Sequence, residues 1–468
     1  MLCECYKHQP ASNKIITTLF INMKYLVVRN FGPIKDINLE IKDYEIFIGP
    51  QASGKSTIAK LIYYFLSLKE DIKQYVIEYI ANNKEISPNN GQINIMKKHR
   101  TKFVQLFGTT KHMKSFDISF TYDINHSIQL KLKEGYVTFI YSEQFKKELG
   151  NLLNKVNEYI SVESGNILEN DIFTQYIFHK KFLSEITYDI NRMTGHDEST
   201  VIYVPACRSL LATLSDYIYR LIHVPFSSDI SSIPDSTLDY SSKSFIDRIS
   251  TLKEQFTQSL DDIIKDKRKL SAQDTKIDSY SLDEIKKLIY LILKGEYRYS
   301  KNEERLYYND KDYVKLSLSS SGQQESVWIL QLIFSLVLEN TKTTLLIEEP
   351  EAHLYPEAQK DIVSLISLFS NINDNRIIIT THSPYILTSI NNLIYAKKVG
   401  SKNYKEVNDI ISSKCWIDIN KVNAFYVDKG CITSIIDTEL GQIQAEKIDS
   451  ISNVLNEQFD QLIDIEEL

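Results

Sequence analysis

The spacing of apolar residues along the chain predicts strands and helices in alternation. Strand-like runs, either alternating or continuously apolar, occur at residues 24–30, 38–42, 44–48, 116–122, 127–132, 135–141, 201–204, 297–300, 306–308 and 313–318. The unbroken apolar runs at residues 345–347 and 377–379 favour central strands of a parallel sheet that is covered on both faces. A hairpin is expected at residues 425–427 and 432–436.

Helical spacing follows several of these strands. Apolar residues at i, i+3, i+4 and i+7 predict a helix from residue 58 onward, and residues 327–338 are apolar on nearly all sides, as in a buried helix. A further helix is expected between the two central strands. Residues 245–263 carry apolar positions three and four apart and predict one amphipathic helix or short coil, with fewer than the ~3–4 heptads of a convincing coiled coil. Residues 448–463 predict an amphipathic helix at the end of the chain.

These elements predict an α/β fold with a mixed sheet, an antiparallel β lobe and large helical insertions. A chain of 468 residues has room for about three domains or for one split domain. The split domain that holds the mixed sheet is called the head. The expected parts are an N-terminal extension (1–22), the first part of the head with the β lobe (23–142, with a helical insertion near 67–115), a helical insertion (143–199), a head strand (200–208), a second insertion (209–311), the second part of the head (312–400) and a C-terminal hairpin and helix (401–468).

Composition restricts the class of protein. With 43% hydrophobic and 25% charged residues the chain is expected to fold compactly. It has no apolar run of the ~18–20 residues that cross a membrane and no signal-peptide pattern, and its five cysteines are scattered, so we expect a cytoplasmic protein without a membrane partner. A net charge of −7 means that contact with nucleic acid would need a local basic surface, for which residues 97–100 and 265–269 are the candidates.

A phosphate-binding loop is predicted at residues 49–56. The sequence Gly-Pro-Gln-Ala-Ser-Gly-Lys-Ser fits G-x-x-x-x-G-K-[ST] and lies between a predicted strand and a predicted helix. Its glycines let backbone N–H groups approach phosphates, Lys55 would neutralise the β- and γ-phosphates of ATP, and Ser56 would offer its hydroxyl to Mg²⁺. The residues expected to bind nucleotide here are Gly49, Pro50, Gln51, Ala52, Ser53, Gly54, Lys55, Ser56 and Thr57.

Two acidic residues end the predicted strand at residues 345–347, at the edge where ligands bind in open α/β sheets. Glu348 is expected to reach Mg²⁺, directly or through water. Glu349 is expected to orient or deprotonate the attacking water. The P-loop and this acidic pair together predict an ATP hydrolase.

Two further motifs indicate the class of ATPase. Residues 319–324, Ser-Ser-Ser-Gly-Gln-Gln, precede the buried helix, and residues 380–383, Thr-Thr-His-Ser, end the next strand. Here the chain resembles the ATP-binding-cassette (ABC) ATPases, in which a signature, an acidic strand and a switch histidine occur in this order. The resemblance implies a head-to-tail homodimer or higher homo-oligomer, in which Ser320, Gly322 and Gln323 of one subunit cover the ATP held by the other. It also implies that His382 contacts the γ-phosphate, so that Lys55, Glu349 and His382 form the catalytic set.

Several positions depart from the ABC pattern. Ala206 stands where transporter cassettes have a glutamine after the strand at 201–204, so that either Arg208 or a residue elsewhere takes over the sensing of Mg²⁺ and water, or the link is absent. Ser321 replaces the first glycine of the signature. Glu348 replaces the usual metal-binding aspartate, which suggests the non-transporter branch.

Within that branch the chain resembles the OLD and RecF-like ATPases. The resemblance rests on residues 30–34 (Asn-Phe-Gly-Pro-Ile), 348–356 (Glu-Glu-Pro-Glu-Ala-His-Leu-Tyr-Pro) and 381–384 (Thr-His-Ser-Pro). It implies that Glu351 and His353 lie in the loop that crosses to the partner subunit. OLD nucleases carry a Toprim domain with an Asp-x-Asp motif, but no such motif follows His382, so we expect no nuclease domain here.

The leading hypothesis is an ATPase that closes on ATP and gates a separate nuclease or toxin effector, as similar standalone ATPases do in bacterial anti-phage systems such as PARIS and Septu. The alternatives are a RecF- or SMC-like DNA-repair ATPase, a transporter's nucleotide-binding subunit and a scaffold that binds ATP without turnover. The absence of a long coiled coil weakens the SMC-like hypothesis. Ala206 in place of the glutamine weakens the transporter hypothesis. The sequence leaves DNA open as a partner.

Overall fold

The computed structural model describes residues 23–82, 87–165, 172–206, 208–210, 239–270, 279–301, 303–309, 311–444 and 456–463. The extension expected at residues 1–22 lies outside these residues. Of the helix expected at residues 448–463, the part from 456 to 463 is described; it is helical and exposed.

A six-stranded sheet forms the centre of the head. Its strands, in the order β14-β13-β3-β12-β11-β7, are β3 (Tyr44–Ile48), β7 (Thr200–Val204), β11 (Thr343–Glu348), β12 (Arg376–Thr381), β13 (Val422–Asp428) and β14 (Cys431–Ser434). All neighbours pair in parallel except β13 and β14, which form the hairpin expected from the sequence. Along β11, Leu345 and Ile347 join one hydrophobic core and Leu346 joins the other, so both faces are covered as predicted.

The antiparallel lobe is a five-stranded sheet in the order β2-β1-β4-β5-β6. Its strands are β1 (Lys24–Phe31), β2 (Ile34–Ile41), β4 (Asp117–Thr121), β5 (Ser127–Lys133) and β6 (Tyr136–Tyr141). Smaller sheets are formed by β8 (Glu296–Ser300), β9 (Glu303–Tyr307) and β10 (Tyr313–Lys315), and by β15 (Ile436–Asp437) and β16 (Gln442–Ile443). The strand predicted at 313–318 ends at Lys315, because the next three residues form a 3-10 turn, η3 (Leu316–Leu318), that buries Leu316.

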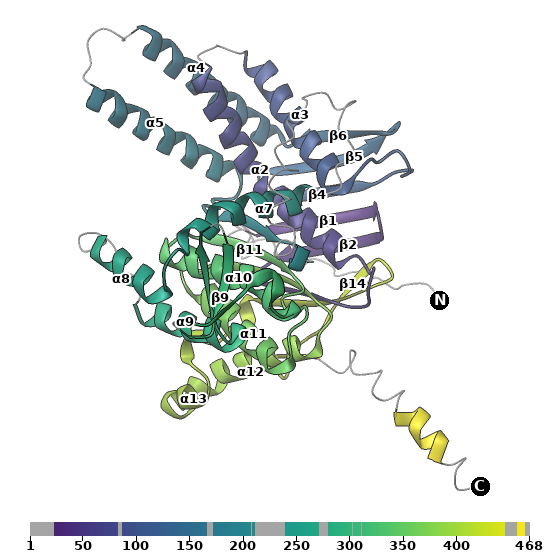
Figure 1. Ribbon diagram of the computed structural model, residues 1–468. Helices are drawn as coiled ribbons and strands as arrows, with labels where there is room; N and C mark the ends of the chain where they lie inside the picture. Colours follow the sequence, from purple (N-terminus) through teal and green to yellow (C-terminus); the bar gives the residue numbers. More distant parts are fainter. Residues whose placement is uncertain are drawn as a thin grey trace.

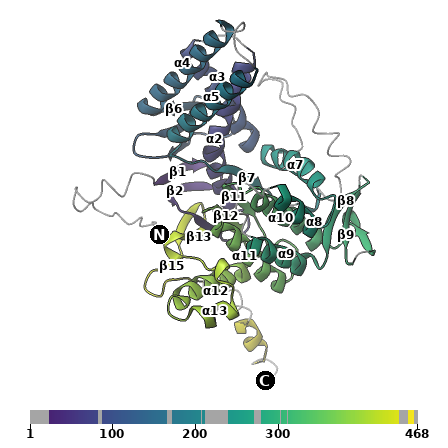
Figure 2. The ribbon, with the colours of Figure 1, turned by 90° about the vertical axis from the view of Figure 1, so that its left-hand side faces the viewer.

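Helices cover both faces of the central sheet (Figures 1 and 2). On one side lie α7 (Tyr240–Leu252), α8 (Leu260–Leu270), α9 (Ser279–Leu293), α10 (Ser321–Leu338), α11 (Pro356–Asn371) and α12 (Pro384–Gly400), with α13 (Tyr404–Ile410) beside α12. On the other side α2 (Lys55–Ala81) packs between the two sheets. The helices α3 (Pro88–Phe107), α4 (Glu143–Gly165) and α5 (Ile172–Met193) pack beside α2 and project away from the central sheet (Figure 1).

The single amphipathic helix expected at residues 245–263 is wrong, because the structure has two helices there. α7 ends in the turn η2 (Lys253–Gln255), and α8 begins after Ser259, whose hydroxyl accepts a hydrogen bond from the backbone N–H of Asp262 at 3.2 Å. Between them the carbonyl of Phe256 accepts a hydrogen bond from the backbone N–H of Tyr299 at 2.7 Å. This pairing with β8 takes the carbonyl out of helical bonding and breaks the helix.

In the described residues, no helix has both the length and the apolar character needed to span a lipid bilayer.

Candidate functional site

Four neighbouring parallel strands bring the predicted site residues to one edge of the central sheet. The P-loop follows β3, the Thr381-His382 segment ends β12, the acidic pair ends β11, and the segment from Pro205 to Arg208 follows β7. Because the carboxyl ends of parallel strands meet at one edge, the topology places these segments side by side.

The P-loop needs glycine at two positions, one because of a close neighbour and one because of its backbone conformation. A Cβ on Gly49 would lie 2.1 Å from the carbonyl oxygen of Val427 in β13, and Gly54 has φ 110°, a left-handed conformation. Gly54 is also the N-cap of α2, which begins at Lys55, so the loop leads directly to a helix N-terminus. The buried Ser53 hydroxyl has no hydrogen-bond partner within the described part of the chain, so it is available to bind a phosphate oxygen.

Lys55 lies folded into the loop. Its Nζ donates to the carbonyl oxygens of Gly49 and Pro50 at 3.0 and 2.8 Å, and the residue is only 5% exposed. Burial lowers the pKa of Lys55, while the negative charges of Glu349, Glu351 and Glu348 act in the opposite direction. These carboxylates show that the lysine faces the acidic end of β11, where a triphosphate would bring further negative charge.

Glu348 fits a metal-binding role. Its Oε2 accepts a hydrogen bond from the backbone N–H of Ala206 at 3.1 Å, while its buried Oε1 has no partner among the described residues. Ser56 is exposed at the start of α2. Mg²⁺ takes few protein ligands when it binds together with substrate phosphates, so one unpaired carboxylate oxygen and one exposed hydroxyl suit it. In the described residues, no cluster of three metal-ligating side chains is found.

Glu349 adopts a strained backbone conformation. Its φ is 44°, in the left-handed region that non-glycine residues seldom occupy, and its backbone N–H donates to Thr380 O at 2.8 Å. The carboxylate oxygen Oε1 lies 3.3 Å from His382 Nε2, and both side chains are partly open to solvent. The structure therefore brings together the two residues that the sequence assigned to water activation and γ-phosphate contact.

Glu351 ties the acidic loop (residues 349–355, between β11 and α11) to the switch segment (residues 381–383). Its Oε1 accepts hydrogen bonds from Thr381 Oγ1 at 2.5 Å and from the His382 N–H at 2.9 Å, and burial raises its pKa. The Ser383 hydroxyl donates to Gln359 Oε1 at 2.6 Å, which adds a link to α11. The switch segment is thus held by two hydroxyl groups and by the backbone N–H of His382, and none of these bonds uses the imidazole, which is partly exposed.

The predicted signature residues form the start of α10. Ser320 is the N-cap and forms a capping box with Gln323, whose amide also donates to Leu293 O at 2.7 Å. A Cβ on Gly322 would lie 2.7 Å from His353 O, so only glycine allows this close approach to the acidic loop. Ser320 and Ser321 are exposed, and within the described residues no hydrogen bond joins residues 320–323 to residues 49–57.

The structure also gives the surroundings of Arg208, which the sequence left open, and of two residues that the sequence did not single out. Arg208, suggested as a sensor of Mg²⁺ and water, is fully buried and spends its guanidinium on backbone carbonyls, those of Glu348 and Glu349 among them. Its partner Glu325 in α10 was not singled out at all. Tyr203 in β7 lies beside Glu348, and burial together with that negative charge raises the pKa of its hydroxyl.

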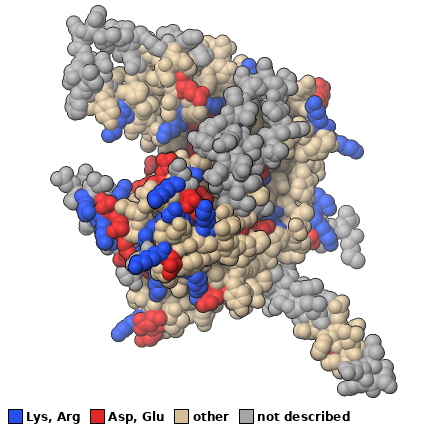
Figure 3. All heavy atoms as spheres, in the orientation of Figure 1, with Lys and Arg blue, Asp and Glu red and all other residues tan. Residues whose placement is uncertain are grey.

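The two basic runs do not form a strongly basic field. In α8, Lys265 and Lys269 pair with Asp262 and Asp266 at 3.5 and 3.2 Å. Lys98 in α3 pairs with Glu78 at 3.2 Å. Figure 3 shows basic and acidic side chains interspersed over the face in view, including the region of α8.

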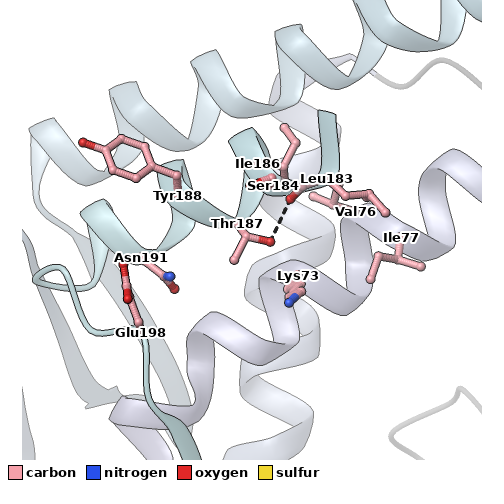
Figure 4. Close-up of a pocket in the computed structure, with 10 residues that line it drawn as sticks. All are labelled: Lys73, Val76, Ile77, Leu183, Ser184, Ile186, Thr187, Tyr188, Asn191 and Glu198. Carbon is pink, nitrogen blue, oxygen red and sulfur yellow. Dashed lines mark hydrogen bonds between the residues drawn. The ribbon is translucent and has the colours of Figure 1, made fainter. Parts of the chain in front are cut away.

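A cavity of about 540 Å³ lies away from the P-loop, between α2 and α5 (Figure 4). Lys73, Val76 and Ile77 of α2 line one side, and residues of α5 such as Tyr188 line the other. No residue of the P-loop or of the acidic loop contributes to it, so it is separate from the site described above.

Three comparisons with known proteins were made, against protein families, curated proteins and solved structures. The model of a family described as "AAA ATPase domain" matches residues 23–387. A search of curated proteins found no match. Among solved structures, the chain is similar to an SMC head bound to the C-winged helix domain of ScpA, with 12% identity and a TM-score of 0.40 over 88% of this chain and 97% of that one.

Two further structures show weaker similarity. For the SMC head domain from Thermotoga maritima the identity is 12% and the TM-score 0.34, over 89% and 98% of the two chains. For the recombination mediator protein RecF the values are 10% and 0.32, over 89% and 100%.

The family match extends from the first strand of the β lobe into α12 and includes the P-loop, the acidic pair and the switch segment. The chain therefore belongs to the AAA ATPase domain family and is an ATP-hydrolysing enzyme.

Proposed function

We propose that two copies of this chain bind ATP between the P-loop of one and the exposed start of α10 of the other. The observation that carries the proposal is that the start of α10 is exposed and, within the described residues, makes no hydrogen bond to the P-loop of its own chain. The P-loop, Glu348, Glu349 and His382 converge at the sheet edge, whereas Ser320 and Ser321 at the start of α10 face solvent. An 18-residue helix whose N-terminus is exposed and flanked by serine hydroxyls suits a phosphate group supplied from outside the chain.

Exposed apolar side chains support self-association at this edge. Leu318, Tyr355 and Tyr385 are 73, 78 and 53% exposed, and each lies within a few residues of the signature, the acidic loop or the switch histidine. Large exposed apolar side chains gathered at one functional edge are typical of a contact surface.

In the proposed mechanism, Lys55 releases the carbonyls of Gly49 and Pro50 and binds the β- and γ-phosphate oxygens. Ser56 and Glu348 would hold Mg²⁺, which would supply positive charge to neutralise the phosphates. Glu349 orients the attacking water and accepts its proton, and His382 donates a hydrogen bond to the γ-phosphate. The start of α10 from the second copy completes the phosphate contacts.

The finer part of the proposal concerns what hydrolysis does. We place the ATPase in bacterial anti-phage defence, where the ATP-closed state holds a separate nuclease or toxin and hydrolysis releases it. The support is the resemblance of residues 348–356 and 381–384 to OLD-like ATPases, and the projecting helices α4 and α5 offer a surface for such an effector. A RecF- or SMC-like role on DNA is the competing function, and stimulation of turnover by DNA is the result that would favour it.

The decisive experiment compares wild type with Glu349→Gln and Lys55→Ala. We expect both substitutions to reduce ATP turnover by at least ~100-fold, since each removes a group that acts in the transition state. Glu349→Gln should retain ATP and increase in molar mass by light scattering when ATP is added, because it keeps the binding groups and loses the base. Lys55→Ala should show no such increase.

The outcome separates the two candidate functions. Turnover lost in both variants, with an ATP-dependent mass increase in Glu349→Gln alone, supports the sandwich. Unchanged mass in Glu349→Gln with ATP bound would contradict it and would direct attention to a monomeric ATPase. Turnover that rises with double-stranded DNA would replace the effector-gating function by one on DNA.

A further inference from the structure

A fully buried arginine joins the start of α10 to the loop that carries the catalytic carboxylate. Arg208 is 0% exposed, and Glu325, in the second turn of α10, is 2% exposed. Arg208 Nε donates to the carbonyl oxygen of Glu325 at 2.9 Å and lies 3.4 Å from its Oε2. The Glu325 carboxylate in turn accepts hydrogen bonds from the backbone N–H groups of Arg208 and Ser209, at 2.9 and 3.0 Å.

The other end of the guanidinium fixes the backbone of Glu349. Nη1 donates to Glu348 O at 2.7 Å and Nη2 donates to Glu349 O at 2.9 Å. These two carbonyls belong to the peptide planes on either side of the Glu349 Cα, so the arginine restrains both φ and ψ of that residue. It restrains them where restraint is needed, because φ of Glu349 is 44°.

The chemistry of this contact is specific to arginine. The planar guanidinium directs N–H groups to three backbone carbonyls, Pro205 O at 2.8 Å included, and to α10 at the same time. Lysine carries the same charge on a compact ammonium and cannot span these acceptors. A buried ion pair often adds little net stability compared with apolar residues of the same volume, so packing alone does not account for it.

A second contact joins the same two segments. Gly322, three residues before Glu325, approaches His353 O so closely that a Cβ would lie 2.7 Å from it. The start of α10 therefore approaches the acidic loop directly at His353 and is joined through Arg208 to the carbonyls of Glu348 and Glu349. A shift of α10 must move Glu349, the loop after it, or both, because packed segments of this kind move together.

We propose that Arg208 is a positioning residue, which holds Glu349 in its left-handed conformation and, through Glu325, couples that conformation to the position of the start of α10. The coupling rests on the proposed function, in which the start of α10 contacts the ATP of the second copy. Occupation of one site then sets the geometry of the catalytic carboxylate in the other. The two sites of the dimer hydrolyse ATP cooperatively for this reason.

The test uses Arg208→Lys and Glu325→Gln in the full chain. The second variant has the same shape as the native side chain and keeps the experiment informative if the first does not fold. We expect Arg208→Lys to lower kcat by about 10–100-fold while KM stays within about twofold, because a small displacement of the base affects the transition state and not ground-state binding. Glu325→Gln should lower kcat less and reduce the Hill coefficient for ATP toward 1.

Lys102→Met is the matched control. Lys102 is also buried, with its Nζ 3.0 Å from Asp71 Oδ1, but it lies between α2 and α3 away from the acidic loop. This variant should lose thermal stability and keep its kcat and Hill coefficient when assayed well below its Tm. A purely structural role for Arg208 predicts that all three variants behave in this way.

Three results would overturn the positioning role or the coupling, and a fourth would overturn the dimer on which the coupling rests. kcat values of both test variants close to that of wild type, or a rise in KM with kcat unchanged, refute the positioning role. A normal Hill coefficient in Glu325→Gln refutes the coupling. If Glu349→Gln shows no ATP-dependent mass increase, the proposed dimer fails and the coupling with it, whereas a kcat fall in Arg208→Lys still establishes that the arginine positions Glu349 within one chain.

Discussion

Burial shifts the pKa of an acidic side chain close to the P-loop. Glu45, in the strand that leads into the loop, is fully buried, and burial raises its pKa to about 8 from an ordinary value of 4.5. Hydrogen bonds from the Lys42 N–H at 2.5 Å and from Asn423 Nδ2 at 3.0 Å oppose this shift without cancelling it. The folded protein therefore holds a proton on Glu45 in a pH range where the unfolded chain has released it.

This shift predicts a pH-dependent effect of Glu45→Gln. Because the folded pKa lies above the unfolded one, the contribution of Glu45 to stability is fully present below about pH 4.5 and is lost as the pH rises toward 8. The amide does not titrate, so the Tm of the variant minus that of wild type should increase from pH 5.5 to pH 8.5, by about 2 °C or more. Calorimetry at both pH values measures it, with the exposed Glu439→Gln as control. A Tm difference that is the same at both pH values would show that Glu45 is charged throughout.

Among the structural elements, the start of α10 needs a glycine because of its close contact with a neighbouring loop, although glycine is a poor helix former. Alanine in place of Gly322 would add helix propensity of up to ~1 kcal/mol, but its Cβ would meet the backbone oxygen of His353 at 2.7 Å. Gly150 in α4 provides a matched control, because its added Cβ would meet only the flexible amide of Gln92, at 3.1 Å. The two substitutions are therefore the same chemical change in two different surroundings.

We expect Gly150→Ala to raise the stability by about 0.5–1 kcal/mol and to leave ATP turnover unchanged. Gly322→Ala should lower stability and reduce kcat by about tenfold or more, since α10 must move away from the acidic loop. Thermal unfolding and steady-state ATPase assays measure both effects. If Gly322→Ala gains stability and keeps its kcat, the close contact between α10 and His353 has no role in the site.

The sequence predicts those parts of this site that are local in the chain. The P-loop occupies eight consecutive residues, and Glu348 and Glu349 follow an apolar strand that could only be central, so position along the chain was enough to place them. Arg208 and Glu325 are 117 residues apart, and no spacing rule relates them. The break at Phe256 was missed for the same reason, because its cause is a hydrogen bond from β8, which is distant in sequence. Long-range backbone contacts therefore account for most of what the sequence did not reveal.

At the scale of the whole molecule, the P-loop, Glu349 and His382 lie at one edge of the central sheet, and the start of α10 is exposed. Apolar side chains at this edge would be covered when two copies close on ATP. Leu318 stands two residues before the N-cap of α10, and Tyr355 is the N-cap of α11 at the end of the acidic loop. Tyr136, on β6 in the β lobe, is 72% exposed and is not expected to be covered when two copies close.

Leu318→Asp and Tyr355→Asp test this surface, each made in the Glu349→Gln background so that ATP is retained. An aspartate at a closing apolar surface brings a charge that has no partner there, and its desolvation opposes association. We expect the ATP-dependent increase in molar mass to be lost, while affinity for a fluorescent ATP analogue in the monomer stays within about threefold of the parent, because neither side chain belongs to the P-loop. Tyr136→Asp in the same background should keep the mass increase. An increase that survives in both test variants would mean that the ATP-bound copies meet through another surface, and a loss in Tyr136→Asp as well would mean that added negative charge alone prevents association.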